Sequence, residues 1–351
     1  MKKLKVGYWP LSDALTSPGD RRRLVFWANS RGHEIITDTE RKVDVIVATE
    51  NADFNSKYFK QARVPVVFDL VDAYLSPLNT LNDFMRGLAK SVSGQISGDI
   101  KPFSEHVKEF CLDSNAVICS SIEQEAIIRA FNRNTHVILD SHDEIPLMTP
   151  RDLRITDSKK KTILWEGQPA TIRGVREIST TLGEIAKTDN LRFEFVTDEY
   201  FYQFLGKHLK KSTAVRLKKD LSEISDRVSL IPWSLVNLIE SARKSSMAMI
   251  PIDLSVPMQE LKPENRLLIM WRLGLPCLTS ASPAYSRVMS NAGTSGICNG
   301  DEDWKIHFEK FLNDGSFAFD EVARGQVYLR ENHTSAILLN KWDDAIASVV
   351  G

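Results

Sequence analysis

The sequence predicts an α/β protein with two successive parallel sheets, and three observations support this prediction. Short apolar runs rich in β-branched residues, such as residues 43–49 (VDVIVAT) and 64–70 (VPVVFDL), alternate with segments of helical character. Continuous runs of this kind are typical of strands that helices cover on both faces. The alternation starts again after a polar stretch at residues 141–161, and 351 residues are enough for about two domains.

Composition excludes several classes of protein. Hydrophobic residues make up 42% and charged residues 26%, as in ordinary globular proteins, and the formal net charge of −1 gives no sign of a nucleic-acid partner. No apolar run approaches the roughly 20 residues of a membrane span, and the N-terminus (MKKLKVGYWP) lacks a signal-peptide core. The four cysteines are widely spaced without a CxxC pair. We therefore expect a cytoplasmic protein without a metal site.

The first half reads as six strands joined by helices. Asp20 is expected to cap a helix that runs to Ser30, and Gly32 ends that helix before the second strand. The first loop lacks the GxGxxG and GK[ST] spacings, which argues against a dehydrogenase or a nucleoside triphosphatase. The expected strands are residues 3–9, 33–38, 43–49, 64–70, 116–120 and 135–140, with helices at 20–30, 78–91 and 121–132 and a Gly/Ser-rich loop at 91–102.

Two aspartates stand at the exit of the fourth expected strand. Asp69 and Asp72 would lie at the carboxyl edge of the sheet, where ligands of parallel sheets bind. They could accept a hydrogen bond from a substrate hydroxyl, or they could cap the next turn, and the sequence leaves both interpretations open.

The second half begins with a strand at residues 161–167 and a helix that follows Arg173-Gly174 and runs to Lys187. Further strands are expected at residues 191–198 and 227–233, the second ending in Trp233 with Ser234 as a helix cap. The basic segment between them, residues 199–219, is interpreted as a helix. It is either a solvated face or a weak peripheral contact with an anionic membrane.

The stretch at residues 246–290 predicts a strand–helix–strand unit. Pro263 stands where the first helical residue is expected, Gly274 ends the helix, and residues 277–280 form the next strand, before a helix that starts at Ser282-Pro283. The helix start carries Lys262, Glu264, Asn265 and Arg266. Two cations and an amide beside free backbone N–H groups suit a diphosphate, although an ordinary buried helix with a polar start is the alternative.

The run PENRLLIMWRLGLPCLTSASPAY resembles the nucleotide-sugar segment of GT-B-fold glycosyltransferases, especially the retaining glycosyltransferase family 4 (glycosyl transferases group 1). The resemblance implies an α/β fold of two Rossmann-like domains whose parallel sheets face a cleft. It implies an acceptor domain at residues 1–145, a linker at 146–160, a nucleotide-sugar domain at 161–330 and a terminal helix at 331–351 that returns to the first domain.

The resemblance also implies roles for individual residues. Arg173 would contact the nucleotide diphosphate, while Gln168 stands where the family often has a second arginine. Ile269 stands where many members have a glutamate that holds the ribose, and Glu264 could take its place. Trp233 could stack on the base, or it could belong to the core. Candidate catalytic residues are Glu260, near the donor sugar, and Asp72.

The function implied is transfer of a hexosyl or deoxyhexosyl group from a nucleotide-sugar, such as a UDP- or GDP-sugar, to a glycan, lipid-linked or other hydroxyl acceptor. Such enzymes serve polysaccharide biosynthesis. Retention of anomeric configuration follows from the resemblance, and no cofactor or metal is expected because side-chain cations would stabilise the leaving diphosphate. The alternatives are a GT-B sugar-nucleotide epimerase and a non-catalytic protein that binds a nucleotide or a partner.

Overall fold

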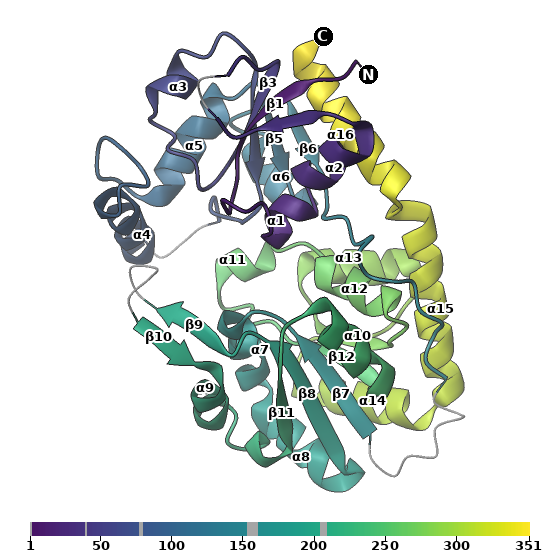
Figure 1. The fold of residues 1–351 in the computed structure, drawn as a ribbon. Coiled ribbons are helices and arrows are strands. Elements are labelled where there is room, and N and C mark those ends of the chain that lie inside the picture. The colour runs from purple at the N-terminus through teal and green to yellow at the C-terminus, as the bar shows by residue number, and fades with distance from the viewer. Residues whose placement is uncertain (1, 39–40, 77–79, 153–160, 204–208) are drawn as a thin grey trace. The chain divides into compact units, whose positions relative to one another are not determined.

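The computed structural model describes residues 2–38, 41–76, 80–152, 161–203 and 209–351. The fold is α/β with two parallel six-stranded sheets, as predicted (Figure 1). The chain divides into two compact units. The first unit comprises Met1–His142, Leu261–Pro263 and Thr334–Gly351, and the second comprises Asp143–Glu260 and Glu264–His333.

The first unit is built on the sheet β2-β1-β3-β4-β5-β6, in which all neighbours are parallel. β3 and β4 are buried along their whole length, which explains their continuous apolar sequences. The strands are β1 (Lys5–Trp9), β2 (Glu34–Ile36), β3 (Val45–Thr49), β4 (Val66–Leu70), β5 (Ala116–Cys119) and β6 (Thr135–Val137). The helices are α1 (Pro18–Arg21), α2 (Leu24–Arg31), α3 (Lys57–Lys60), α4 (Thr80–Val92), α5 (Phe103–Asp113), α6 (Ile122–Ile128) and α16 (Ser335–Val350).

The predicted cap at Asp20 is wrong. Pro18 starts the short helix α1, and Asp20 lies inside it with no exposed surface. Its carboxylate accepts hydrogen bonds from the Tyr8 hydroxyl at 2.7 Å and the Leu11 amide at 2.8 Å, so it ties β1 to the following loop instead. Gly32 does end α2, in the left-handed conformation that glycine adopts easily (φ 72°).

The C-terminal helix α16 packs on the first unit. Trp342 stacks on Trp27 of α2 with ring centroids 5.8 Å apart, and the Trp27 indole N–H donates to Asp343 at 2.8 Å. Ala345 and Ile346 are buried in the same core as β1 and β3. The last helix therefore returns to the unit formed by the start of the chain and contributes to its core (Figure 1).

The second unit is built on the parallel sheet β11-β8-β7-β12-β13-β14. Ser234 and Ser282 cap α10 and α13 as predicted, accepting from the Asn237 and Tyr285 amides. The strands are β7 (Lys161–Glu166), β8 (Leu191–Thr197), β11 (Val228–Pro232), β12 (Met247–Ile250), β13 (Cys277–Ser280) and β14 (Ile297–Cys298). The helices are η1 (Pro169–Thr171), α7 (Ile172–Glu177), α8 (Ser179–Asp189), α9 (Thr213–Asp220), η2 (Ser225–Arg227), α10 (Leu235–Lys244), α11 (Pro257–Glu260), α12 (Asn265–Arg272), α13 (Pro283–Ala292), α14 (Asp301–Asn313) and α15 (Gly315–Asn332).

The helix predicted over residues 199–219 is wrong. β9 (Tyr200–Gln203) and β10 (Leu209–Ser212) pair as antiparallel strands there, and among the described residues of this range only those of α9 are helical. The three consecutive aromatic residues of β9 have high strand propensity. The pairing of Tyr202 with Lys210 joins two segments of the chain, and helical periodicity within one segment does not detect it. Among the described helices, none combines the length and apolar character needed to cross a bilayer.

The central helix α12 is buried along most of its length, as predicted. Trp271 packs so closely on α15 that a Cβ added to Gly325 would lie 2.4 Å from its ring. Gly274 ends the helix region with φ 72°, and the chain at Met148 and Arg151 hydrogen-bonds to the carbonyls of Arg272 and Gly274. Glycine is thus needed at both positions for this packing.

Candidate functional site

The carboxyl edge of the second sheet carries most of the predicted binding residues. β7 ends at Glu166, Trp233 follows β11, Asp253 follows β12, and α12 starts at Asn265. Because the strands are parallel, these residues belong to one edge of the sheet, and this is the edge where ligands of open α/β sheets bind.

Glu166 is the centre of the contacts at this edge. Its carboxylate accepts a hydrogen bond from the Trp233 indole N–H at 3.1 Å. The Arg266 guanidinium donates to the Glu166 backbone carbonyl, and the Arg266 Nε lies 3.7 Å from the other carboxylate oxygen. Arg266 also lies over the Trp165 ring, 5.5 Å from its centroid. The predicted residues Trp233 and Arg266 are therefore joined by a third residue.

The sequence interpretation did not include Glu166. A signal for it exists, because a carboxylate at the end of an apolar strand, directly before Gly167, interrupts the pattern of β7. A Cβ added to Gly167 would lie 3.2 Å from the Arg266 guanidinium. Glycine at this turn therefore leaves room for the arginine.

Arg173 lies at the start of α7 and pairs with Asp253. Burial would raise the pKa of Asp253, but hydrogen bonds from Ser255 and the Arg173 cation outweigh it and hold the pKa below its usual value. Gly174 brings α7 against the loop after β12, since an added Cβ would lie 2.3 Å from the Pro251 carbonyl oxygen. The Arg173 side chain nevertheless keeps 48% of its surface exposed, so it can also contact a ligand.

The start of α12 differs from the prediction. The helix begins at Asn265, two residues after Pro263, with Glu264 as its N-cap residue. Glu264 is only 5% exposed and lies 3.6 Å from Arg287 of α13. The Asn265 side-chain oxygen is buried and has no hydrogen-bond partner among the described residues. Ile269 is buried with 3% exposure, so this position belongs to the core.

Lys262 belongs to the first unit. Its ammonium lies 2.5 Å from the Asp72 carboxylate, and the neighbouring Leu261 carbonyl accepts a hydrogen bond from Ser121 at 2.7 Å. These contacts hold residues 261–263 outside α12, which explains why the helix starts later than predicted. Lys262 and Asp72, for which the sequence predicts separate roles, are therefore paired with each other.

Asp72 and Glu50 form a cluster of carboxyl groups at the carboxyl edge of the first sheet. Burial would raise the pKa of Asp72, but the Lys262 cation outweighs it and holds the pKa below its usual value. Burial, assisted by the Asp72 charge, raises the pKa of Glu50 to about 8. Burial also lowers the pKa of Lys90 to about 8, and the Lys90 ammonium donates to the Glu50 carbonyl at 3.4 Å.

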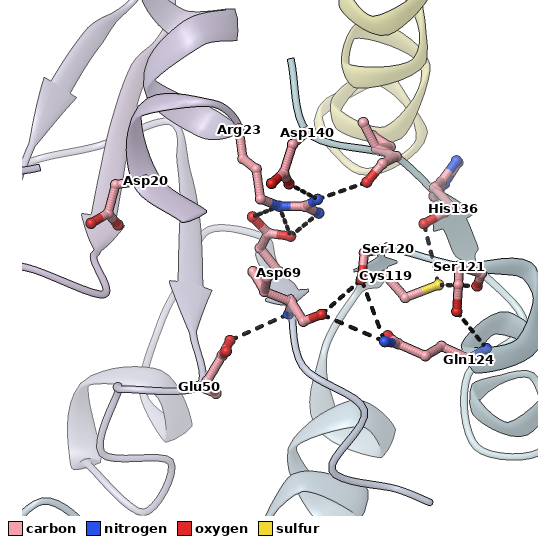
Figure 2. Close-up of polar contacts among 12 residues, drawn as sticks. Asp20, Arg23, Glu50, Asp69, Cys119, Ser120, Ser121, Gln124, His136 and Asp140 are labelled. Atoms are coloured by element: carbon pink, nitrogen blue, oxygen red, sulfur yellow. Dashed lines mark hydrogen bonds and ion pairs between the residues drawn. The ribbon is translucent and has the colours of Figure 1, made fainter. Parts of the chain in front are cut away.

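Asp69 lies in a separate buried network (Figure 2). Its carboxylate receives three hydrogen bonds from the Arg23 guanidinium at 2.5–3.1 Å, and both side chains are 0% exposed. Asp140 lies 3.3 Å from the same guanidinium. Asp69 therefore binds Arg23 and is not available to a substrate hydroxyl.

The remaining predicted residues are more exposed. Glu260 is the last residue of α11 and is exposed, as is Gln168, whereas Trp233 is half-buried. Within the described ranges, no group of three or more His, Cys, Asp and Glu side chains could hold a metal ion. The roles assigned to Glu260, Asp72, Arg173, Trp233, Lys262, Glu264, Asn265 and Arg266 stay predictions.

Comparison of the structure with solved proteins identifies the fold as GT-B. WaaG, a glycosyltransferase involved in lipopolysaccharide biosynthesis, is 11% identical with a TM-score of 0.59, and the match covers 99% of each chain. HepE from Anabaena in complex with UDP and glucose is 11% identical with a TM-score of 0.65, over 98% of this chain and 100% of HepE. TarM is 10% identical with a TM-score of 0.61, over 86% of this chain and 54% of TarM.

The chain thus spans about half the length of TarM. A TarM variant from S. aureus was solved with fondaparinux, α-GlcNAc-glycerol and UDP. No protein-family model matches the sequence. No curated protein matches it either.

Proposed function

We propose that this GT-B chain is a glycosyltransferase whose second unit binds the diphosphate of a nucleotide-sugar. One observation carries the proposal: Arg173, Arg266 and Trp233 lie at the carboxyl edge of the second sheet, where α12 begins. Two guanidinium groups suit a diphosphate, and a half-buried indole suits a nucleobase. WaaG, a glycosyltransferase, shares the fold over nearly the whole chain, which supports the same activity.

The proposed chemistry depends on stabilising the leaving group. Cleavage of the anomeric C–O bond places negative charge on the departing nucleoside diphosphate. Arg173, Arg266 and the free N–H groups at the start of α12 would stabilise that charge through fixed electrostatics. Asn265, with its buried and unpartnered side-chain oxygen, and Glu264 would contact the donor at the same helix start. Glu260 is our candidate for the sugar contact.

We assign the acceptor to the first unit. Asp72 stands at the carboxyl edge of its sheet, and the Lys262 pair keeps the carboxylate ionised at neutral pH. An ionised carboxylate can accept a hydrogen bond from an acceptor hydroxyl. We further propose a glycan or lipid-linked acceptor and retention of anomeric configuration, which NMR of the product linkage would test.

The donor is proposed to be a UDP-sugar, because HepE was solved with UDP-glucose and the TarM variant with UDP. Thermal shift with UDP, GDP and ADP, followed by transfer assays with the corresponding sugars, tests this. A ligand that binds only the folded chain raises its melting temperature. Failure of every nucleotide to shift the transition would contradict the donor site. Epimer formation without transfer would favour the epimerase instead.

Transfer is also proposed to proceed without a metal, with the arginines as the cations that a metal would otherwise provide. The test is transfer after dialysis into excess chelator. Activity should persist. Loss of activity that magnesium or manganese restores would contradict this part of the proposal.

The hairpin β9–β10 is our proposed contact with an anionic membrane. Tyr202 is paired with Lys210, so the two share one face of the hairpin, and Tyr200 lies two residues away on that face. Tyr200 and Tyr202 are 49% and 57% exposed, and the Lys210 ammonium lies 3.9 Å from the Tyr200 ring centroid. Exposed Lys211, Lys218 and Lys219 add positive charge on β10 and α9. Tyrosine and lysine together suit the interface of an anionic bilayer.

Sedimentation with phosphatidylglycerol vesicles tests this contact, with phosphatidylcholine vesicles as the comparison. The chain should sediment with the anionic vesicles only, and Tyr200→Ala with Tyr202→Ala should abolish it. Val236→Ala, at an exposed position on α10, is the control. Equal binding by the double variant would remove the hairpin from the contact.

A further inference from the structure

We infer that Glu166 is a positioning residue for the nucleotide, because it fixes both the indole of Trp233 and the guanidinium of Arg266. The base contact and the diphosphate contact of the second unit would then depend on one side chain. This inference rests on the proposed function and adds to it the residue that joins the two parts of the ligand site.

The position of Trp233 requires an anchor of this kind. Trp233 follows β11, and β8 lies between β11 and β7 in the sheet. The Trp233 backbone amide donates to the Thr197 carbonyl at the end of β8, at 3.0 Å. Its indole N–H then reaches Glu166 at the end of β7, at 3.1 Å. Trp233 is therefore held by its backbone at β8 and by its indole at β7.

Arg266 reaches the same carboxylate from the other side of β7. It lies on α12, which follows β12, the neighbour of β7 opposite β8. The Glu166 carbonyl, the Glu166 carboxylate at 3.7 Å and the Trp165 ring at 5.5 Å hold the guanidinium. A guanidinium has five N–H donors in a rigid fork, so these contacts leave donors for a diphosphate. Glu166 thereby sets the orientation of the Arg266 guanidinium.

The charge of Glu166 makes it possible to distinguish a positioning role from a purely electrostatic effect. A carboxylate that acted only through its charge would repel a diphosphate, so its removal would tighten binding. A carboxylate that positions Trp233 and Arg266 would have the opposite effect, because its removal frees both side chains. The direction of the change in affinity therefore separates the two interpretations.

The experiment measures dissociation constants of UDP and pyrophosphate by calorimetry for the full chain and its variants. We expect Glu166→Ala to weaken UDP binding about tenfold and pyrophosphate binding by a smaller factor, because Arg266 is the only one of the two side chains positioned by Glu166 that pyrophosphate would contact. Glu166→Gln keeps an oxygen that can accept from Trp233, so it should recover part of the UDP affinity. Glu194→Gln is the control, since Glu194 is in register with Leu164 on the neighbouring strand, away from the edge.

A double-mutant cycle completes the test. Trp233→Phe keeps an aromatic ring and removes the indole N–H. It should weaken UDP binding in the wild-type background and change it by about twofold or less beside Glu166→Ala, because the bond is already lost. Thermal unfolding identifies a misfolded variant, in which case Glu166→Gln replaces Glu166→Ala in the cycle.

The outcomes separate this inference from the proposed function. The positioning role would be overturned if the losses of UDP affinity in Glu166→Ala and Trp233→Phe were additive. It would also be overturned if Glu166→Ala and Glu166→Gln bound UDP as tightly as wild type or more tightly. Either result would leave the nucleotide site in place. A wild-type chain that binds neither UDP nor pyrophosphate would overturn both.

Discussion

The arginines at the carboxyl edges of the two sheets differ in their burial and in their partners. In the first unit, Arg23 and Asp69 are both fully buried and bind each other (Figure 2). In the second unit, Arg173 pairs with Asp253 but remains 48% exposed, and Arg266 shares Glu166 with Trp233. Buried ions must be satisfied within the protein, whereas a half-exposed cation retains donors for a ligand. The comparison indicates a structural role for the first set and supports the binding role that we propose for the second.

The largest expected effect concerns the buried pair. Asp69→Ala leaves the Arg23 cation buried without its main partner, and breaking a buried pair in this way costs about 3–5 kcal/mol. Chemical denaturation should show this loss in the free energy of unfolding, while the UDP affinity of the folded protein stays unchanged. The control is Glu34→Ala, which removes the exposed pair with Arg41 in the same unit and should cost about 1 kcal/mol or less. Equal losses in the two variants would contradict the buried role.

Local signals explain most of what could be predicted from the sequence. Strand runs such as β4 and helix caps such as Ser234 depend on neighbouring residues, and they appear in the structure as expected. The second sheet also confirms the strand–helix–strand unit, since β12 and β13 are parallel neighbours.

Long-range pairing explains what could not be predicted. Lys262 is close to Arg266 in sequence, which suggested one site, but Lys262 bonds to Asp72, 190 positions away. The sequence predicts a helix where β9 and β10 lie because lysine and leucine suit either structure, and the strands are defined by their pairing with each other. Glu166 interrupts the apolar pattern of β7, but this local signal does not reveal its role, because that role depends on Trp233 and Arg266 reaching it from two other parts of the chain.

The second prediction uses the pH dependence of the first unit. The pKa of the Glu50 carboxyl is about 8 in the folded chain, against an ordinary value of 4.5 that applies when the chain is unfolded. Between these two pH values the folded chain holds a proton that the unfolded chain has lost. Stability should therefore fall as pH rises from about 4.5 to about 8, at roughly 1.4 kcal/mol for each pKa unit. At that slope the upper limit over this range is about 5 kcal/mol, and relaxation of the site and water penetration on ionisation should reduce it below the loss expected for Asp69→Ala.

Unfolding free energies of wild type and Glu50→Gln across this pH range provide the measurement. The decrease in the free energy of unfolding with rising pH should be absent or reduced in Glu50→Gln, because the glutamine side chain cannot ionise. The matched comparison is Glu260→Gln, an exposed residue of the second unit. Parallel curves for wild type and Glu50→Gln would show that this carboxyl is not the source and would weaken the contrast between the two edges.

The smallest expected effects compare the two cations that flank the start of α12. Arg266→Ala removes the charge-assisted hydrogen bonds that we propose to the diphosphate, each worth about 1.5–3 kcal/mol, so UDP affinity should fall about tenfold or more. Lys262→Ala should weaken UDP binding by about threefold or less, because Lys262 pairs with Asp72 in the first unit. Both side chains are partly exposed, so neither change should cost much stability.

Arg176→Ala, on the exposed side of α7, controls for the loss of one positive charge. Calorimetric titration of UDP into the three variants measures these dissociation constants. Equal losses of affinity in Arg266→Ala and Lys262→Ala would show that Lys262 also contacts the donor, and would contradict the different roles that we propose for the two sheet edges.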